Sequence, residues 1–293
     1  MAEPTHPRKP SSPAAPAKEA LGWLHTARFL TSASRIEQLP QGDLPEIAFV
    51  GRSNAGKSSA INTLAQQRQL AFASKTPGRT QLINLFALGP RDAADAYFAD
   101  LPGYGYAAVA RGKKLVWQQV MADYLEVRRA LMGVVLMVDS RHGFTPLDRQ
   151  LLEFVAQRVR TGEVKLLVLL TKADKLTKAE TQRAVAAAQE VLGDFVTDDS
   201  DIGVAPFSAM RRLGVEDAAE TVRAWVASAP PRVEFALPPA PPEEGDPVPA
   251  APEDGDPAPT APEGGGPVPA PPDDGNPASA PSKDGDPAPA AAD

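Results

Sequence analysis

The sequence predicts a three-layer α/β/α fold built on a mostly parallel, six-stranded sheet with one antiparallel strand, flanked by disordered tails. Two observations lead to this prediction. From Glu46 onward, short runs rich in Val, Ile and Leu alternate with longer segments of helical periodicity, which is the pattern of βα units around a parallel sheet. Moreover, 20 of the 32 prolines lie in residues 230–293. The foldable part is therefore long enough for one well-buried core.

The expected strands lie at 47–50, 82–88, 96–99, 134–138, 166–170 and 204–207. Helices are expected near 57–67, 113–130, 146–160, 177–192 and 214–227. The second and third strands are joined by residues 89–95, a segment too short for a crossover helix. These two strands should therefore form an antiparallel hairpin at one side of an otherwise parallel sheet.

Composition divides the chain into three parts. Residues 1–20 are polar and rich in Pro and Ala, so we expect a disordered leader without the apolar core of a secretory signal. Residues 21–229 form the folded domain. Residues 230–293 form an acidic, Pro-rich tail in which residues 241–290 repeat with a ten-residue period, as in PPEEGDPVPA and APEDGDPAPT, but the repeats have no apolar face to stack. We expect an extended acidic spacer there.

Charge and cysteine content exclude several classes of function. The net charge is −7 for the whole chain and −11 for residues 230–293, which leaves +4 on the rest. A mildly basic body suits approach to RNA or to a ribosomal surface, and it equally suits an ordinary solvated surface. The chain has no cysteine, which excludes disulfides and thiolate metal sites. We expect a cytoplasmic monomer without a membrane span.

One loop carries the strongest chemical signal. It follows the strand at 47–50, opens the next helix, and consists of Gly51, Arg52, Ser53, Asn54, Ala55, Gly56, Lys57 and Ser58. Its glycines let backbone N–H groups converge on the phosphates of a nucleotide, Lys57 adds a positive charge, and Ser58 offers a hydroxyl to Mg²⁺. The loop alone does not separate ATP from GTP.

Two later segments address the base. Thr171, Lys172, Ala173 and Asp174 follow the strand at 166–170, at the sheet edge where open α/β folds bind ligands. A carboxylate there accepts hydrogen bonds from N1–H and N2–H₂ of guanine, which adenine cannot supply, while the lysine braces the loop. A solvated loop is the alternative. Phe207, Ser208 and Ala209 follow the last strand, where backbone N–H groups would meet guanine O6.

Two further segments are expected to contact the γ-phosphate and the metal ion. They comprise Asp100, Leu101, Pro102 and Gly103 after the third strand, and Gly78, Arg79, Thr80, Gln81 and Leu82 before the second. Asp100 could bind Mg²⁺ through a water molecule, and the backbone N–H of Gly103 could contact the γ-phosphate. A strand-ending aspartate in a turn is also common without any such role. Thr80 is preferred to Thr76 as a metal ligand, but spacing does not separate them.

These five segments occur in one order at the ends of successive strands, which predicts a Mg²⁺-dependent protein that binds and hydrolyses GTP, with Lys57, Thr80 and Gly103 in catalytic roles. They also resemble the EngB (YihA/YsxC) family of the TrmE-Era-EngA-EngB-septin-like P-loop GTPases. The matching stretches are GRSNAGKSSAIN, SKTPGRTQLINLF, FADLPGYGYA, TKADKL and FSA, and the likeness spans residues 22–229.

The resemblance supports Ser58 and Thr80 as Mg²⁺ ligands. It implies a role in assembly of the large (50S) ribosomal subunit, with rRNA and ribosomal proteins as partners and a link to cell division and septum formation. Related GTPases bind K⁺ partly through an asparagine of the phosphate loop, which Asn54 matches, although that side chain would equally brace the loop. The repeats at residues 230–293 have no counterpart in the family.

Two alternatives remain at this point. Ras-like proteins place a water-orienting glutamine near the position of Tyr104, and its absence leaves no evident catalytic base. Hydrolysis is therefore expected to be slow without a partner, and a non-hydrolysing, GTP-gated scaffold for cell-division proteins is conceivable. A small-molecule phosphotransferase would use the same loop, but Asp174 and the lack of an acceptor domain disfavour it.

Overall fold

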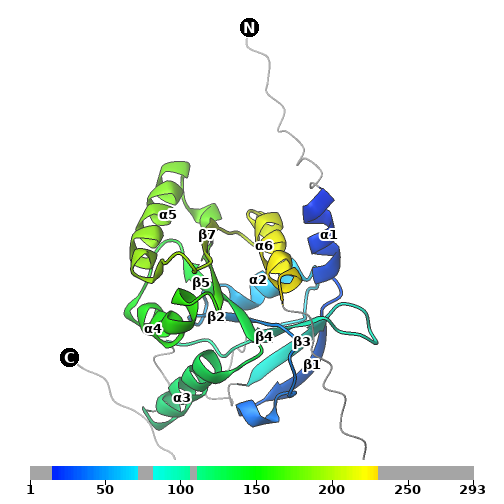
Figure 1. Ribbon diagram of the computed structural model, residues 1–293. Coiled ribbons are helices and arrows are strands. Elements are labelled where there is room, and N and C mark those ends of the chain that lie inside the picture. The colour runs from blue at the N-terminus through cyan, green and yellow to red at the C-terminus, as the bar shows by residue number, and fades with distance from the viewer. Residues whose placement is uncertain (1–14, 72–81, 106–110, 230–293) are drawn as a thin grey trace, which may run out of the picture. The chain divides into compact units, whose positions relative to one another are not determined.

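The computed structural model describes residues 15–71, 82–105 and 111–229. Seven strands form one sheet in the order β1-β3-β4-β2-β5-β6-β7 (Figure 1). The strands are β1 Arg28–Ala33, β2 Glu46–Gly51, β3 Ile83–Leu88, β4 Ala96–Asp100, β5 Leu131–Asp139, β6 Lys165–Thr171 and β7 Ile202–Pro206. The helices are α1 Ala15–Leu24, α2 Lys57–Leu64, α3 Arg111–Val127, α4 Pro146–Arg160, α5 Lys178–Leu192 and α6 Val215–Ala227.

The direction of the strands follows the prediction. β2 pairs in parallel with both β4 and β5, and the parallel pairing continues through β6 to β7. β3 alone runs the other way, because it is antiparallel to β4 and to β1. The predicted hairpin and the mostly parallel sheet with one antiparallel strand are confirmed.

The seventh strand, β1, was not predicted. Its register against β3 shifts between Phe29 and Thr31, so the apolar/polar alternation that indicates a strand is interrupted. β1 also lies at the edge of the sheet, where Phe29 and Leu30 are exposed. An edge strand with a bulge lacks the buried apolar run by which the other strands were recognised.

The N-terminal boundary of the folded domain also differs from the expectation. α1 begins at Ala15, so residues 15–20, which we assigned to a disordered leader, are helical. Pro16 is tolerated because it stands in the first turn, where the backbone N–H has no partner within the helix. Ala17 and Ala20 are buried, and α1 packs against α6. Tertiary packing therefore overrides the Pro/Ala-rich composition. Residues 1–14 and 230–293 lie outside the described residues.

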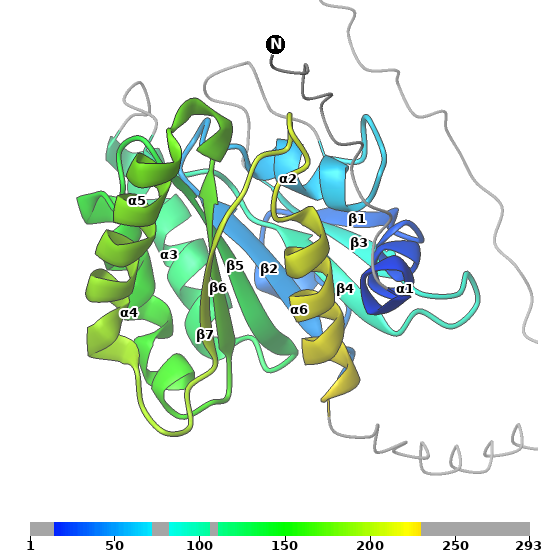
Figure 2. The same cartoon turned by 90° about the horizontal axis from the view of Figure 1, so that it is seen from above.

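The sheet is sandwiched between two layers of helices, as Figure 2 shows. α1, α2 and α6 cover one face, and their apolar side chains pack with those of the sheet into one core that includes Leu24, Ile61 and Trp225. α3, α4 and α5 cover the other face, where a second core includes Leu125, Val155 and Leu192. None of the helices in the described ranges combines the length and hydropathy that a membrane crossing requires.

Side-chain caps fix where α4 and α5 begin. Thr145 accepts a hydrogen bond from the backbone N–H of Asp148, and the Asp148 carboxylate accepts one from the Thr145 backbone N–H. Thr177 and Glu180 make the same reciprocal pair at the start of α5. Each cap satisfies backbone donors that have no partner within the helix, and each contributes about 1 kcal/mol.

A buried charge cluster holds the end of α3 against the start of β2. Glu46 is fully buried, and its carboxylate accepts hydrogen bonds from Arg128 at 2.5 and 3.0 Å and from the Tyr124 hydroxyl at 2.6 Å. Burial and the neighbouring carboxylate raise the pKa of Tyr124 well above its ordinary value, so the phenol stays protonated and donates. The hydrogen bond to Glu46 likewise raises the pKa of Arg128.

Glu46→Ala is expected to lower the free energy of unfolding by about 3–5 kcal/mol, because the variant leaves the Arg128 guanidinium buried without its counter-charge. Urea denaturation at neutral pH measures this loss. Asp43→Ala, at an exposed position three residues earlier, is the matched control and should change stability by less than ~0.5 kcal/mol. A loss at Glu46 as small as that of the control would contradict this account of the cluster.

Candidate functional site

The candidate site lies where the chain leaves the central strand of the sheet. β2 stands between β4 and β5. The strand order therefore runs from β2 toward β4 in one direction and toward β5 in the other. Because β2, β4, β5 and β6 are parallel, their carboxyl ends meet at one edge, which brings Gly51, Asp100, Asp139 and Thr171 to neighbouring positions. Ligands bind at such a reversal of strand order in open α/β sheets.

The predicted phosphate loop connects β2 to α2 as expected. Gly56 directly precedes α2 and has a φ of +100°. Residues other than glycine rarely adopt this backbone conformation. A Cβ on Gly51 would lie 2.9 Å from the Met137 carbonyl oxygen of β5, so only glycine fits there without a shift. Asn54 also has a positive φ, of 67°, which asparagine tolerates better than most residues.

The segment after β4 is hydrogen-bonded to this loop through the backbone. The Ser53 N–H donates to the Tyr104 carbonyl at 2.7 Å, and the Tyr104 N–H donates to the Gly51 carbonyl at 3.3 Å. The predicted γ-phosphate sensor, Gly103, therefore lies directly against the phosphate loop, with Ser53 as its neighbour. Two segments that the sequence placed about fifty residues apart are thus held side by side.

Lys57 and Asp100 form an ion pair at this junction. Asp100 is 3% exposed, and its carboxylate accepts from the Lys57 ammonium group. Ser58 follows Lys57 in the first turn of α2 and is partly buried. A hydroxyl and a buried carboxylate are hard oxygen donors of the kind Mg²⁺ prefers. The described residues contain no group of three or more Asp, Glu, His or Cys placed to hold a metal, so a cation here would depend on phosphate and water oxygens as well.

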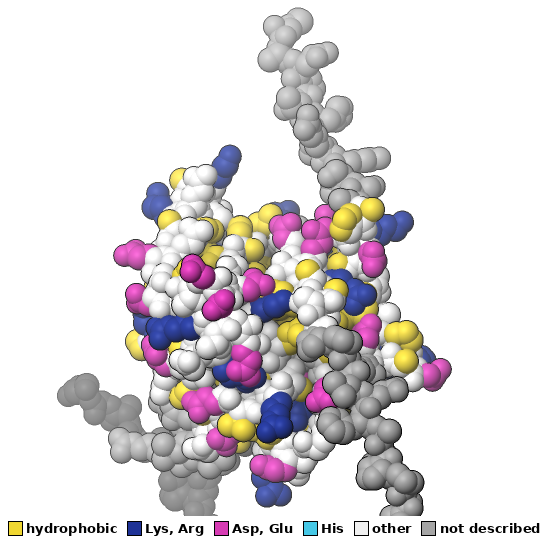
Figure 3. All heavy atoms as spheres, viewed as in Figure 1, with side chains coloured by type: hydrophobic (Ala, Val, Ile, Leu, Met, Phe, Trp, Pro, Cys, Tyr) yellow, Lys and Arg dark blue, Asp and Glu magenta, His cyan; other side chains and the backbone are white. Residues whose placement is uncertain are grey.

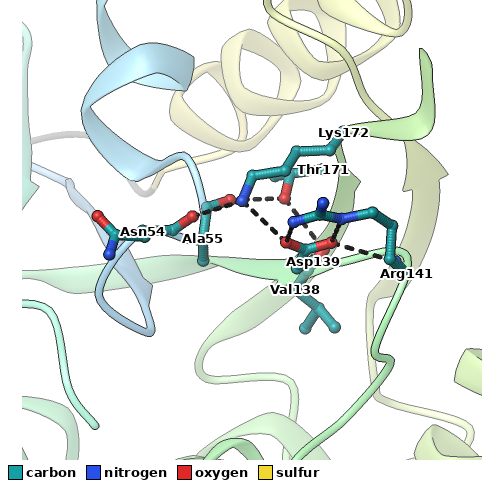
Figure 4. A network of polar contacts seen from close by, with 7 residues as sticks. All are labelled: Asn54, Ala55, Val138, Asp139, Arg141, Thr171 and Lys172. Carbon is teal, nitrogen blue, oxygen red and sulfur yellow. Dashed lines mark hydrogen bonds and ion pairs between the residues drawn. The ribbon is translucent and has the colours of Figure 1, made fainter. Parts of the chain in front are cut away.

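The loop after β6 reaches across to the phosphate loop (Figure 4). The Thr171 hydroxyl donates to the Ala55 carbonyl at 2.5 Å and lies 3.2 Å from the Val138 carbonyl. The Lys172 ammonium donates to the Asn54 carbonyl at 2.7 Å. Lys172 thus contacts the phosphate loop, while its predicted position across the base stays a prediction.

Lys172 has a second partner that was not predicted from the sequence. Asp139, the last residue of β5, accepts from the Lys172 ammonium at 2.8 Å and from the Arg141 guanidinium at 2.7 and 2.9 Å. Burial alone would raise the pKa of Asp139, but these hydrogen bonds outweigh burial and hold the pKa well below its usual range. An acidic residue directly after a predicted buried strand was the signal that would have identified it.

Asp174 is fixed from the neighbouring strand end. Its carboxylate accepts from the Ser208 hydroxyl at 2.6 Å and lies 3.5 Å from the Lys175 ammonium. The Ala173 N–H donates to the Phe207 carbonyl at 3.1 Å, which joins the two predicted base-reading segments. The hydrogen bond from Ser208, followed by the interaction with Lys175, lowers the pKa of Asp174. The carboxylate is thus ionised at neutral pH and presents only acceptors. Ala209 follows, partly buried.

The side chain of Tyr104 is directed away from the phosphate loop. It is 2% exposed, and its hydroxyl donates to the Asp148 carboxylate at 2.5 Å in the first turn of α4. Burial and the adjacent carboxylate raise the pKa of Tyr104 well above its ordinary value, so it remains a neutral donor. Tyr104 therefore anchors the segment after Gly103 to α4 and is not placed to act as a base.

Part of the predicted site lies outside the described residues. This part comprises Gly78, Arg79, Thr80 and Gln81, together with the alternative metal ligand Thr76. Leu82 is described and lies directly before β3. Of the predicted site residues that are described, the phosphate loop, Asp100 to Gly103, Thr171 to Asp174 and Phe207 to Ala209 all come together at the same edge of the sheet.

Comparison with known proteins identifies close relatives. A family model described as "50S ribosome-binding GTPase" matches residues 46–172, and one described as "Elongation factor Tu GTP binding domain" matches residues 122–228. A relative named "Probable GTP-binding protein EngB" from Albidiferax ferrireducens is 57% identical over 206 residues, which cover 70% of this chain and 96% of the relative. Proteins of the same name from Acidovorax ebreus and a Polaromonas species are 57% and 55% identical, over 70% and 71% of this chain and 90% and 82% of theirs.

The charge state of Asp139 gives a prediction for stability against pH. Because its pKa in the folded protein lies below the ordinary 3.8, Asp139 stabilises the fold above about pH 4, and this contribution is lost as the pH falls through the lowered value. Asp139→Asn should therefore lose less stability than the parent between pH 5 and about pH 2. Urea midpoints across this range measure the difference.

Asp198→Asn, at an exposed position outside the site, should keep the slope of the parent protein. Identical slopes for the parent and Asp139→Asn would show that the ion pairs of Asp139 contribute nothing to folding.

Proposed function

Given that the chain belongs to the EngB family of GTP-binding GTPases, we propose that it binds GTP at the edge formed by β2, β4, β5 and β6 and hydrolyses it in a Mg²⁺-dependent reaction. The observation that carries this proposal is the fixed position of Asp174. Its ionised carboxylate is held by Ser208, while Lys172 of the same loop contacts the phosphate loop. A phosphate-binding turn and a guanine-reading acceptor are thereby joined in one unit.

Each part of the proposed site has a distinct role. The backbone N–H groups of residues 52–58 and the Lys57 ammonium bind the β- and γ-phosphates. Asp174 accepts from N1–H and N2–H₂ of guanine, and the backbone around Ser208 and Ala209 meets O6. Lys57 is paired with Asp100. When a triphosphate binds, Lys57 would turn to the phosphates and Asp100 to the metal ion.

Ser58 and Thr80 would hold Mg²⁺ directly and Asp100 through water. The metal ion, when bound, neutralises charge that develops on the phosphates. The donor set in the described residues fits this ion, because Ser58 directly follows Lys57 in α2 and the buried Asp100 carboxylate is paired with Lys57. Gly103 lies against the phosphate loop, and its backbone N–H would donate a hydrogen bond to the γ-phosphate when GTP is bound.

Hydrolysis without a partner should be slow. The Tyr104 side chain is committed to Asp148, so the position after Gly103 supplies no water-orienting group. The remaining means of stabilising the transition state are the phosphate loop, Mg²⁺ and a second cation at Asn54. We propose K⁺ for that role, although the positive φ of Asn54 and the contact of its carbonyl with Lys172 equally support a purely structural role for this residue.

The cellular role proposed here is assembly of the large (50S) ribosomal subunit in the cytoplasm, with a family-level link to cell division and septum formation. It is supported by the description of the matching family model, a 50S ribosome-binding GTPase, and by the net charge of +4 outside residues 230–293. On the face in Figure 3, acidic and basic side chains of the described residues are interspersed. Shape and hydrogen bonding would therefore contribute to ribosome contact beside charge.

Asp174→Asn tests the reading of the base. The substitution replaces a carboxylate oxygen acceptor with an NH₂ donor, so affinity for GDP should fall by roughly 30- to 150-fold, the effect of losing about 2–3 kcal/mol of charge-assisted hydrogen bonding. Affinity for xanthosine diphosphate, which carries a carbonyl at C2, should rise above that for GDP. Fluorescence titration with both nucleotides measures the change, and Asp198→Asn is the control. Unchanged preference for guanine would remove Asp174 from the base site.

Potassium activation is tested by two variants of Asn54. The parent should hydrolyse GTP faster in KCl than in NaCl at equal ionic strength, and Asn54→Ala should abolish the difference. Asn54→Gly keeps the backbone conformation unstrained while removing the same side chain, so it should behave like Asn54→Ala if the side chain binds the ion. Equal rates for the parent in both salts would end the potassium hypothesis.

Sedimentation with isolated large ribosomal subunits tests the cellular role. The protein should co-migrate with the subunits when a non-hydrolysable GTP analogue is bound and should be released in GDP. A chain truncated after residue 229 should behave in the same way, because the proposed contact belongs to the folded domain. Phosphate release should increase in the presence of subunits; no release with or without them would favour the alternative, a non-hydrolysing scaffold for division proteins.

A further inference from the structure

A pocket of about 440 Å³ lies between α4 and α5, on the side of the sheet covered by α3, α4 and α5. The helices that form it stand next to each other in Figure 1. Its walls come from α5, from the start of α4 and from the loop between β5 and α4, and Leu170 of β6 contributes to its lining. Pockets of this volume accept small organic ligands.

The lining combines an apolar surface with positive charge. Leu170 and Ala188 are buried, and Ala184 is partly buried beside them. Arg149 of α4 and Arg183 of α5 stand on opposite helices and are both exposed. Among the described residues no ion pair within 4 Å joins either guanidinium to a carboxylate, although Arg183 lies close enough to Glu180 to lower the pKa of that carboxyl. The one acidic residue of the lining, Glu180, is engaged by the cap of α5. The lining thus carries three arginines and one carboxylate, so its net charge is positive.

Ser140 adds an independent sign of a ligand. Its side chain is 7% exposed and lines the pocket, yet its hydroxyl has no hydrogen-bond partner among the described residues. A buried hydroxyl without a partner costs about 1–3 kcal/mol, so nearly all such groups in folded proteins are satisfied by protein, water or ligand. In a pocket whose lining has a net positive charge, a bound anionic acceptor would satisfy it.

We propose that the pocket between α4 and α5 is a binding site for a small amphipathic anion, a ligand that joins an apolar body to a carboxylate, sulfonate or phosphate. The apolar body lies against Leu170, Ala184 and Ala188. The anionic group accepts hydrogen bonds from the Ser140 hydroxyl and from Arg149 and Arg183. Arg141 also lines the pocket, but its guanidinium donates hydrogen bonds to Asp139. The anion is therefore bound by Arg149 and Arg183.

This site is separate from the proposed nucleotide site. Asp139 and Lys172 contact each other, and neither lines the pocket. Binding of the anion can therefore be measured in nucleotide-free protein. Its failure would leave the proposed function untouched, and a failure of GTP binding would leave the pocket untouched.

The probe is 1-anilinonaphthalene-8-sulfonate, which has an aromatic body and a sulfonate and becomes fluorescent when it leaves water. The full chain should bind one equivalent saturably. N-phenyl-1-naphthylamine, which lacks the sulfonate, should bind at least about tenfold more weakly, because the arginines and Ser140 then have no acceptor. Equal affinity for both dyes, or no saturable binding of the sulfonate, would overturn the proposal.

Two pairs of variants locate the binding. Arg149→Glu combined with Arg183→Glu should weaken sulfonate binding at least about tenfold, whereas Arg35→Glu combined with Arg129→Glu, the same charge change at exposed positions elsewhere, should not. Ala187→Phe fills the pocket without changing charge, and Ala186→Phe places the same side chain on α5 outside the lining. Only Ala187→Phe should abolish binding.

Unfolding curves of all four variants confirm that each is folded before binding is compared. The two test variants are Arg149→Glu with Arg183→Glu, and Ala187→Phe. If only one of them loses binding, or if a control loses as much, the dye binds elsewhere and the assignment of the pocket is overturned.

Discussion

The contact between Lys172 and the phosphate loop is the interaction on which the candidate site depends. The Lys172 ammonium donates both to the Asn54 carbonyl and to the Asp139 carboxylate, so one side chain joins the loops that follow β2, β5 and β6 (Figure 4). Lys172 is only partly exposed, and Asp139 is nearly buried, so this ion pair is screened less than one on the open surface. The distance between the phosphate loop and the loop after β6 is thereby set by hydrogen bonds within the protein itself.

The same arrangement follows from the topology of the sheet. Parallel strands bring their carboxyl ends to one edge, and each loop there needs only a few side-chain contacts to be placed relative to its neighbours. Ser208 positions Asp174, Thr171 reaches the Ala55 carbonyl, and Lys57 pairs with Asp100. Tyr104 connects this edge outward, through Asp148, to the first turn of α4. The segment after Gly103 is therefore held to α4 by a buried hydrogen bond.

Much of this was predictable from the sequence, because strand periodicity and strand-end motifs are local signals. The order of the five segments and the strand at 166–170 placed Lys172 and Asp174 at the correct edge. Contacts set by tertiary packing were not predictable. The role of Asp139 depends on Lys172 folding back across β5, α1 forms because α6 covers it, and the alternation of β1 is broken by its bulge. Thr80, the preferred metal ligand, lies outside the described residues and stays a prediction.

The central claim is that the loop beginning at Gly51 holds the phosphates of a nucleotide whose guanine is recognised by Asp174. Isothermal titration calorimetry of the Mg²⁺-supplemented protein with GDP and with ADP tests it most directly. We expect one GDP per chain and an affinity for ADP at least about 100-fold lower, because adenine offers the Asp174 carboxylate no donors in place of N1–H and N2–H₂ of guanine. Equal affinity for the two nucleotides, or no heat with GDP, would contradict it.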